Sequence, residues 1–173
     1  AMLSAIACAN DAIRQEAARN AEYQHMGTTL VCAVTRSDMA IIGNIGDSRA
    51  YHITPEGIFQ ISRDHSVVEN MVAKGDLTPL EARTHPNRNL ITRALGPDIH
   101  AKADTFELPW HKDEFLLLCS DGLVNTVSDQ EMLFEVLHDG DVNECLDHLL
   151  QISLQRGAPD NITAVLLLNE EGR

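Results

Sequence analysis

The first apolar pattern along the chain has the spacing of a helix. Ile6, Ala9, Ile13 and Ala17 recur at intervals of three or four residues, so they fall on one face. This spacing predicts a helix over residues 5–18, and the polar stretch at 20–25 is expected to end it.

Strand patterns follow this helix. Residues 28–35 alternate Leu30, Cys32 and Val34 with small or branched residues, and a period of two is typical of a strand. The sequence "TPEG" at 54–57 carries the signal of a type I turn. Further strands are predicted before and after that turn, at residues 39–46, 49–53 and 58–62. The first half is therefore expected to be a run of short antiparallel strands behind a helix.

Two short helices with cap signals are expected in the middle of the chain. The first begins at Ser66, has Glu69 three residues later and stops at Gly75. The second helix is expected to begin at Thr78, which has Pro79 directly after it and Glu81 three residues later. An excursion of this kind between strands, here about residues 66–89, often forms a lid.

The last third returns to strands and ends on a strand after two helices. Strands are predicted at 101–108, 114–120 and 161–168, the last two being strongly apolar. The two helices between them are expected to begin at Ser128 and Asp141, each with Glu three residues later. Strands and helices are segregated rather than alternating, which indicates an α+β fold with packed antiparallel sheets.

Composition and charge narrow the classes of function. The 173 residues suit one domain, and 26 acidic against 13 basic residues give a net charge of −13. This excess argues against binding to nucleic acid or to anionic membranes, because both need basic surfaces. The apolar runs are too short to cross a bilayer. Four cysteines lie far apart without Cys-x-x-Cys spacing, so we expect buried thiols in a reducing cytoplasm.

Three aspartates at the ends of predicted strands are the candidates for chemistry. Asp47, Asp121 and Asp160 have small or turn-forming neighbours, and Gly46 and Gly122 would allow close approach of backbone to a ligand. Clustered carboxylates repel one another unless a cation joins them, and their hard oxygens suit Mg²⁺ or Mn²⁺. Taken singly, each aspartate favours a structural role, because Asp is a common turn and cap residue. A calcium loop is not indicated, because closely spaced acidic ligands are absent from the sequence.

The order of the motifs is more specific than any one of them. The segments "MGTTL", "NIGDSRAY", "SRDHS", "NLITRALG", "LLLCSDGL" and "PDNIT" occur in that order. From about residue 5 to residue 168 the chain resembles the metal-dependent protein phosphatase family (PPM, or type 2C), and within it the bacterial members. The resemblance implies an α-β-β-α sandwich of two antiparallel sheets flanked by helices. It also implies hydrolysis of phosphoserine and phosphothreonine on proteins by water activated by two Mn²⁺ or Mg²⁺ ions.

The resemblance also assigns expected roles to individual residues. Asp121 and Asp160 match metal-ligand aspartates, and Asp47 matches an aspartate of a weaker additional metal site. Asn125 stands where some relatives have another carboxylate for that third ion. Gly122 and Asn161 are expected to support the metal ligands or to bind the ion only weakly, and Asn161 is expected to shape the turn around Asp160. The excursion at about 66–89 resembles a flap beside the substrate groove. Phosphoprotein substrates and a partner Ser/Thr kinase are implied as well.

One departure from the family pattern sets further expectations. The family's opening Arg-x-x-Asn-Glu/Gln-Asp and Asp-Gly-Met-Gly-Gly segments do not occur in this sequence. The chain is therefore expected to be a single partial phosphatase domain over residues 1–173 that lacks the N-terminal strands, binds Mn²⁺ weakly and is inactive alone. An exposed sheet edge would favour self-association. The alternative is a non-catalytic binding or regulatory module with a phosphatase-like fold.

Overall fold

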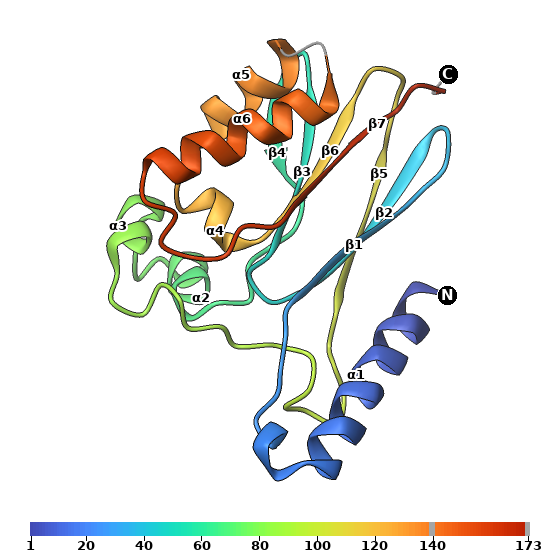
Figure 1. Cartoon of the computed structure of the whole chain (residues 1–173), viewed down its shortest axis with the longest axis vertical. Coiled ribbons are helices and arrows are strands. Elements are labelled where there is room, and N and C mark those ends of the chain that lie inside the picture. Colours follow the sequence, from blue (N-terminus) through green and yellow to red (C-terminus); the bar gives the residue numbers. More distant parts are fainter. Residues whose placement is uncertain (139–140, 172–173) are drawn as a thin grey trace. The chain divides into compact units, whose positions relative to one another are not determined.

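The protein is described by a computed structural model that covers residues 1–138 and 141–171 (Figure 1). Within these residues, seven strands form two sheets. One sheet has the order β1-β2-β5 and the other the order β4-β3-β6-β7. The strands are β1 (Leu30–Thr35), β2 (Met39–Ile45), β3 (Arg49–Thr54), β4 (Gly57–Gln60), β5 (Asp104–Pro109), β6 (Phe115–Cys119) and β7 (Ala164–Leu168). The predicted α+β class with two antiparallel sheets is confirmed.

The register of the four-stranded sheet determines which loops meet at its end. β3 pairs antiparallel with both β4 and β6, and Arg49 lies opposite Cys119. β6 pairs antiparallel with β7, and Cys119 lies opposite Ala164. The residues that follow β6 therefore lie beside the residues that precede β7. This places the loop before Ala164 next to Asp121.

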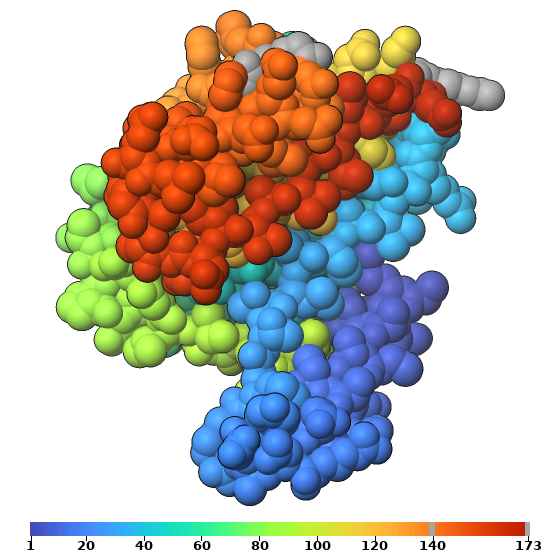
Figure 2. All heavy atoms as spheres, in the orientation of Figure 1, coloured from blue at the N-terminus to red at the C-terminus, as the bar shows by residue number. Residues whose placement is uncertain are grey.

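Alternation along β3 and β6 separates two apolar cores. Ala50 and Leu116 face the three-stranded sheet, where they pack with Ile42 and Trp110. Their neighbours in sequence face the opposite side and pack against α5 (Asp129–His138) and α6 (Val142–Gln155). Period-two alternation thus gives one sheet two buried faces. Figure 2 shows α6 (orange) and β7 (red) side by side at the surface, and they are in contact.

The other helices are α1 (Met2–Arg19), the 3-10 turn η1 (Ala21–Tyr23), α2 (Val67–Lys74), α3 (Pro79–Thr84) and α4 (Asp121–Val124). The predicted cap of α2 is confirmed, because the Ser66 side chain accepts from the N–H of Glu69 and Gly75 closes the helix at φ +80°. A full capping box begins α3 at Thr78. The side chain of Asp141 caps α6.

The chain divides into two compact units. Unit 1 consists of Ala1–Leu30, Gly43–Asp47 and Arg63–Thr105, and unit 2 consists of Val31–Ile42, Ser48–Ser62 and Phe106–Arg173. Both apolar cores described above belong to unit 2. In unit 1, the buried Asn10 of α1 donates to the carbonyls of residues 98 and 99, and its Oδ1 accepts from the N–H of Gly96 at 2.8 Å. The single domain with a flap at about 66–89 stays a prediction.

One sequence-based expectation needs correction. The prediction that all four cysteines are buried is wrong, because Cys8 is exposed and Cys32 is half-buried. Cys8 falls on the outward face of an amphipathic helix, where an apolar neighbourhood in sequence does not imply burial. The residues "SDG" at 120–122 are of the kind that often form turns, and here they begin the short helix α4. In the described part of the chain, no helix is both long and apolar enough to cross a membrane.

Candidate functional site

Ser120 joins the end of β6 to the loop that precedes β7. Its N–H donates to the carbonyl of Thr163 at 2.9 Å. Its hydroxyl donates to the carbonyl of Asn161 at 3.2 Å and accepts from the N–H of Thr163 at 3.0 Å. Three hydrogen bonds thus hold the residues on either side of the sheet end at a fixed separation. Asp121 and Asp160 each lie next to one of these anchored residues.

Gly122 allows a close approach of these same two segments. A Cβ built on Gly122 would lie 2.3 Å from the carbonyl oxygen of Asn161 and 3.0 Å from its carbonyl carbon. From the sequence, Gly122 is predicted to allow close approach of the backbone to a ligand. The space that a side chain would need is instead taken by protein backbone, so this glycine sets the distance between α4 and the loop at 160–163.

Asp121 and Asp160 form an electrostatically coupled pair in unit 2. Asp121 is half-buried at the start of α4, and Asp160 is exposed. Burial raises the pKa of Asp121, and the charge of Asp160 raises it further. Hydrogen bonds from backbone N–H groups at 121 and 122 and the charge of Arg49 oppose this rise without cancelling it. Oδ1 of Asp160 accepts from the N–H of Asn161 at 2.7 Å.

Arg49 is a neighbour of this pair that the sequence analysis missed. Its Nη1 donates to the hydroxyl of Tyr51 at 3.1 Å, and Tyr51 is completely buried. Burial raises the pKa of Tyr51 far above its usual value, so the hydroxyl stays neutral. The positive charge of Arg49 acts on Asp121 and works to lower its pKa. Its position within "GDSRA", on the strand paired with β6, is the signal that could have identified it.

The pair fits a hard divalent cation. Two carboxylates that repel one another, one of them half-buried, are stabilised when a cation neutralises them, and carboxylate oxygens suit Mg²⁺ and Mn²⁺. Within residues 1–138 and 141–171, no group of three His, Cys, Asp or Glu side chains is placed to hold one ion. The carboxylate constellation described in unit 2 is therefore a pair, Asp121 with Asp160.

The remaining candidates occupy different positions. Asp47 is half-buried in unit 1 and follows Gly46, which has φ +104°. A Cβ on Gly46 would lie 2.3 Å from Cγ2 of Thr29, so protein again fills the space that the sequence analysis assigned to a ligand. Asn125 is exposed at the end of α4, where its N–H donates to the carbonyl of Asp121 at 2.9 Å.

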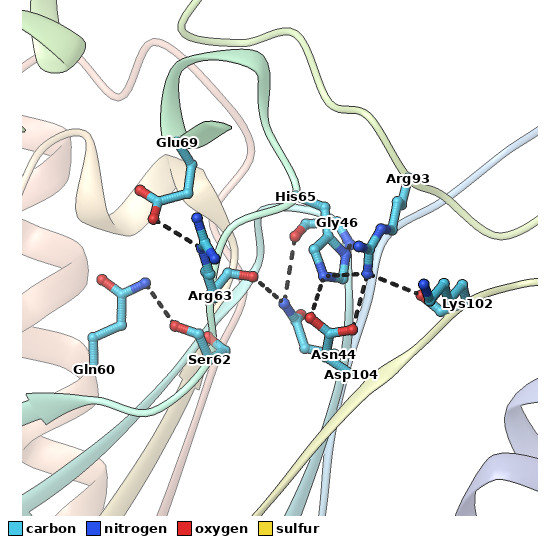
Figure 3. Close-up of polar contacts among 10 residues, drawn as sticks. All are labelled: Asn44, Gly46, Gln60, Ser62, Arg63, His65, Glu69, Arg93, Lys102 and Asp104. Atoms are coloured by element: carbon cyan, nitrogen blue, oxygen red, sulfur yellow. Dashed lines mark hydrogen bonds and ion pairs between the residues drawn. The ribbon is translucent and has the colours of Figure 1, made fainter. Parts of the chain in front are cut away.

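A second polar cluster lies in unit 1, where His65 and Asn44 contact the backbone of Gly46 (Figure 3). The imidazole of His65 contacts the N–H of Gly46 and the carboxylate of Asp104. Asn44 is buried and donates through Nδ2 to the carbonyls of Arg63 and Gly46, at 3.0 and 3.4 Å. Its Oδ1 is the one buried side-chain polar atom without a hydrogen-bond partner among the described residues. A hollow of about 190 Å³ opens beside this cluster, lined by Arg63, Asp64, His65, Asn70, Thr92, Arg93 and Asp104.

Known proteins resemble this chain in sequence and in structure. The family model described as protein phosphatase 2C matches residues 1–166. The serine/threonine phosphatase stp of Listeria monocytogenes serotype 4b (strain F2365) is 36% identical over 151 residues. That match covers 86% of this chain and 60% of the relative, so the chain spans about three fifths of the relative's length.

Solved structures agree with these matches. The serine/threonine phosphatase Stp1 from Staphylococcus aureus superposes with a TM-score of 0.92 at 40% identity, covering 96% of this chain and 66% of that one. The catalytic domain of the serine/threonine protein phosphatase PstP, solved in complex with two manganese ions, superposes with a TM-score of 0.81 at 33% identity. That match covers 91% of this chain and 65% of the PstP chain.

Proposed function

Because this chain belongs to the protein phosphatase 2C family, we propose that the protein is a metal-dependent phosphatase that hydrolyses phosphoserine and phosphothreonine on proteins. The observation that supports this most strongly is the coupled pair of Asp121 and Asp160 at the sheet end. Two repelling carboxylates, one of them half-buried, destabilise a fold, so their placement is best explained by a cation that joins them.

Each candidate residue has a proposed role in holding Mn²⁺ or Mg²⁺. Asp121 and Asp160 supply oxygens to a centre of two ions, and the PstP structure with two manganese ions supports this assignment by analogy. In unit 1, Asp47 is proposed as a ligand of an additional, weaker metal site. In unit 2, Asn125 is at most a weak ligand, because it offers only an amide oxygen. Gly122 and Asn161 are proposed to support the metal ligands rather than to act as main ligands themselves. They fix the spacing between α4 and the loop that carries Asp160.

Residues of this chain would position the divalent ions and favour the ionised form of their ligand Asp121. When bound, the divalent ions supply Lewis acidity and lower the pKa of water so that it can attack phosphorus. The carboxylates of Asp121 and Asp160 orient that centre at the end of the sheet. The charge of Arg49 favours the ionised form of Asp121, which is the form that binds a cation. Tyr51 holds the Arg49 side chain through a buried hydroxyl.

A non-catalytic binding or regulatory module with the same fold is the alternative function. It is disfavoured by the cost of the carboxylate pair, because a module that binds no cation gains nothing from keeping Asp121 and Asp160 close together. The two functions differ in a measurable way, since only the enzyme needs divalent cations for a chemical step.

Mn²⁺ binding and phosphate release test this proposal together. Mn²⁺ binding to the 173-residue chain is followed by calorimetry for the parent, Asp121→Asn, Asp160→Asn and the control Asp11→Asn. Asp11 is an exposed residue of α1. We expect each site variant to weaken Mn²⁺ binding at least 10-fold and the control to leave it unchanged. Equal affinity in all four chains would overturn the assignment.

The activity arm uses a phosphothreonine peptide with Mn²⁺, on this chain and on any longer natural polypeptide that contains it. Release of phosphate that depends on Mn²⁺ and is lost in Asp121→Asn supports the enzyme. Mn²⁺ binding without release from either polypeptide would favour the regulatory module.

Partners and location follow from the same proposal. The substrates are phosphoproteins, and a Ser/Thr kinase that phosphorylates them is the expected opposing enzyme. The chain's acidic charge makes nucleic acid and anionic membranes unsuitable partners. We also propose a cytoplasmic location, with self-association through an exposed sheet edge, which sedimentation velocity at increasing concentration would detect.

A further inference from the structure

The backbone of Gly46, the residue before Asp47, is held on both sides. Its N–H donates to Nδ1 of His65 at 3.1 Å. Its carbonyl accepts from the N–H of His65 at 2.8 Å and from Nδ2 of Asn44 at 3.4 Å. His65 is only 5% exposed and Asn44 is completely buried. The peptide groups that lead into Asp47 are therefore fixed by buried neighbours within unit 1.

The contact with Gly46 determines which nitrogen of His65 carries hydrogen. A backbone N–H can only donate, so Nδ1 accepts, and the hydrogen of the neutral ring lies on Nε2. Nε2 is 3.1 Å from Oδ2 of Asp104, which accepts that hydrogen. A hydrogen on Nδ1 would point at the N–H of Gly46, so these two contacts favour the tautomer with its hydrogen on Nε2.

Asp104 is itself held by Arg93. Nη1 of Arg93 donates to Oδ1 of Asp104 at 2.9 Å, which leaves Oδ2 for His65. Nη1 also lies 3.1 Å from Nε2 of His65, and because Nε2 carries hydrogen, the two groups are neighbouring donors that share one carboxylate. Burial works to raise the pKa of Asp104, but the hydrogen bonds from His65 and Arg93 outweigh it and lower the pKa below its usual value. Asp104 therefore stays ionised at neutral pH.

We propose that His65 is a positioning residue for the cation ligand Asp47: Asp104 fixes the tautomer of His65, and its Nδ1 holds the Gly46 peptide from which the Asp47 carboxylate is presented (Figure 3). The inference rests on the proposed role of Asp47 as a cation ligand. Carboxylate–imidazole pairs commonly orient metal centres through an imidazole that binds the ion. Here the imidazole acts instead on the backbone that precedes the ligand.

The first measurement reads the hydrogen bonds without any metal. In the metal-free parent chain, long-range ¹H–¹⁵N spectra should show His65 with hydrogen on Nε2 and none on Nδ1. In His65→Ala, hydrogen exchange of the Gly46 amide should become at least 10-fold faster. Hydrogen on Nδ1 in the parent, or unchanged exchange in the variant, would overturn the inference.

The second measurement reads the consequence for the ion. Loss of a contact that orients a metal ligand typically weakens metal binding about 10–100-fold, so we expect a loss of that size at the Asp47 site in His65→Ala. His65→Asn keeps an acceptor near the position of Nδ1 and should recover part of the affinity. His100→Gln, at an exposed residue of the same unit, is the matched control and should bind as the parent does.

Two further variants keep the outcomes separate. Unchanged Mn²⁺ affinity in Asp47→Asn would overturn the role of Asp47, and with it the consequence proposed for the ion. Weakened binding in Asp47→Asn together with parental binding in His65→Ala would overturn the role of His65 alone. Should His65→Ala fail to fold, Asp104→Ala removes the acceptor for Nε2 and should weaken binding in the same direction, and parental binding there would also count against the proposal.

Discussion

At the scale of the residue, the site in unit 2 depends on how two carboxylates are brought close together. The pKa of Asp121 is raised by its burial and by the charge of Asp160. The close approach that produces this repulsion is permitted by Gly122 and held by the hydroxyl of Ser120. The same contacts that make the pair unfavourable without a cation make it a good ligand set with one.

Asp160→Asn should therefore have opposite effects without and with metal. Without metal at pH 7, the variant should be more stable than the parent by less than about 1 kcal/mol, because solvent screens an exposed partner. With Mn²⁺ at about 100 times its Kd, the parent should gain about 2.7 kcal/mol and the variant much less. Urea unfolding with and without Mn²⁺ measures both differences.

The pH dependence of the stability difference between Asp160→Asn and the parent, measured without metal, tests this electrostatic explanation. The pKa of Asp121 is higher in the folded than in the unfolded state. The ionised Asp121 therefore lowers the free energy of unfolding once pH rises through the folded-state pKa, and this loss of stability vanishes below the unfolded-state pKa. The advantage of Asp160→Asn should therefore disappear in acid. An advantage that persists unchanged at low pH would rule out this electrostatic origin.

Gly122→Ala should damage both stability and metal binding. Its Cβ would overlap the carbonyl of Asn161, which is backbone and cannot turn aside. We expect a loss of about 1–3 kcal/mol of unfolding free energy, as for other overpacked sites, and weaker Mn²⁺ binding because the loop with Asp160 must move. Gly75→Ala is the control, since φ +80° makes it strained but its Cβ would meet nothing within 4 Å. It should lose stability and keep Mn²⁺ affinity, whereas equal Mn²⁺ losses in both variants would argue against the steric explanation.

At the scale of the element, the helix ends are stabilised by hydrogen bonds between residues that lie close together in the sequence. α5 begins at a reciprocal pair in which Ser128 and Glu131 hydrogen-bond each other through side chain and backbone. Arg156, which follows α6, donates to both oxygens of Glu131 and to the carbonyl of Thr126. One carboxylate thus caps α5 and ties it to the end of α6. The hydrogen bond from Arg156, followed by those from Ser128, lowers the pKa of Glu131 far below its usual value.

Glu131→Gln should lower stability in a pH-dependent way. Because the folded pKa of Glu131 is lowered, its contribution is complete above the ordinary pKa of glutamate, about 4.3, and is lost as pH falls through the folded pKa. At pH 7 we expect a fall of about 2–4 °C in Tm, the usual size for a lost cap in a domain of this length. The difference should shrink in acid. Thermal unfolding at both pH values, with the exposed Glu107→Gln as control, measures it, and a difference independent of pH would contradict the role of the charge.

At the scale of the whole molecule, one sheet is buried on both faces within unit 2. Leu116 belongs to the core between the two sheets, and Met132 belongs to the core between the four-stranded sheet and the helices α5 and α6. The strand β6, which ends two residues before Asp121, lies between these cores. The position of the carboxylate pair is therefore set by packing on both sides of the sheet.

Truncation on either face should destabilise unit 2. Leu116→Ala and Met132→Ala each remove a completely buried side chain, and we expect losses of about 2–5 kcal/mol in unfolding free energy. Leu154→Ala makes the same chemical change at a side chain of α6 that is 52% exposed and should cost far less. Urea unfolding compares the three variants. Similar losses at Leu116 and Leu154 would contradict the described core.

The sequence by itself determined the features that depend on nearby residues. Helix caps such as Ser66 with Glu69 act over one turn, and strand alternation acts over neighbouring residues, so both can be read from local patterns. The candidate aspartates and the family resemblance were also visible, because they lie in short motifs.

Only the tertiary structure decided which distant residues meet. The repulsion between Asp121 and Asp160 depends on the pairing of β6 with β7, and the contact of His65 with Asp104 joins residues 39 positions apart. Exposure of Cys8 likewise depends on which face of α1 is buried. Local patterns do not specify these contacts, since they follow from strand register and packing between segments that are remote in the chain.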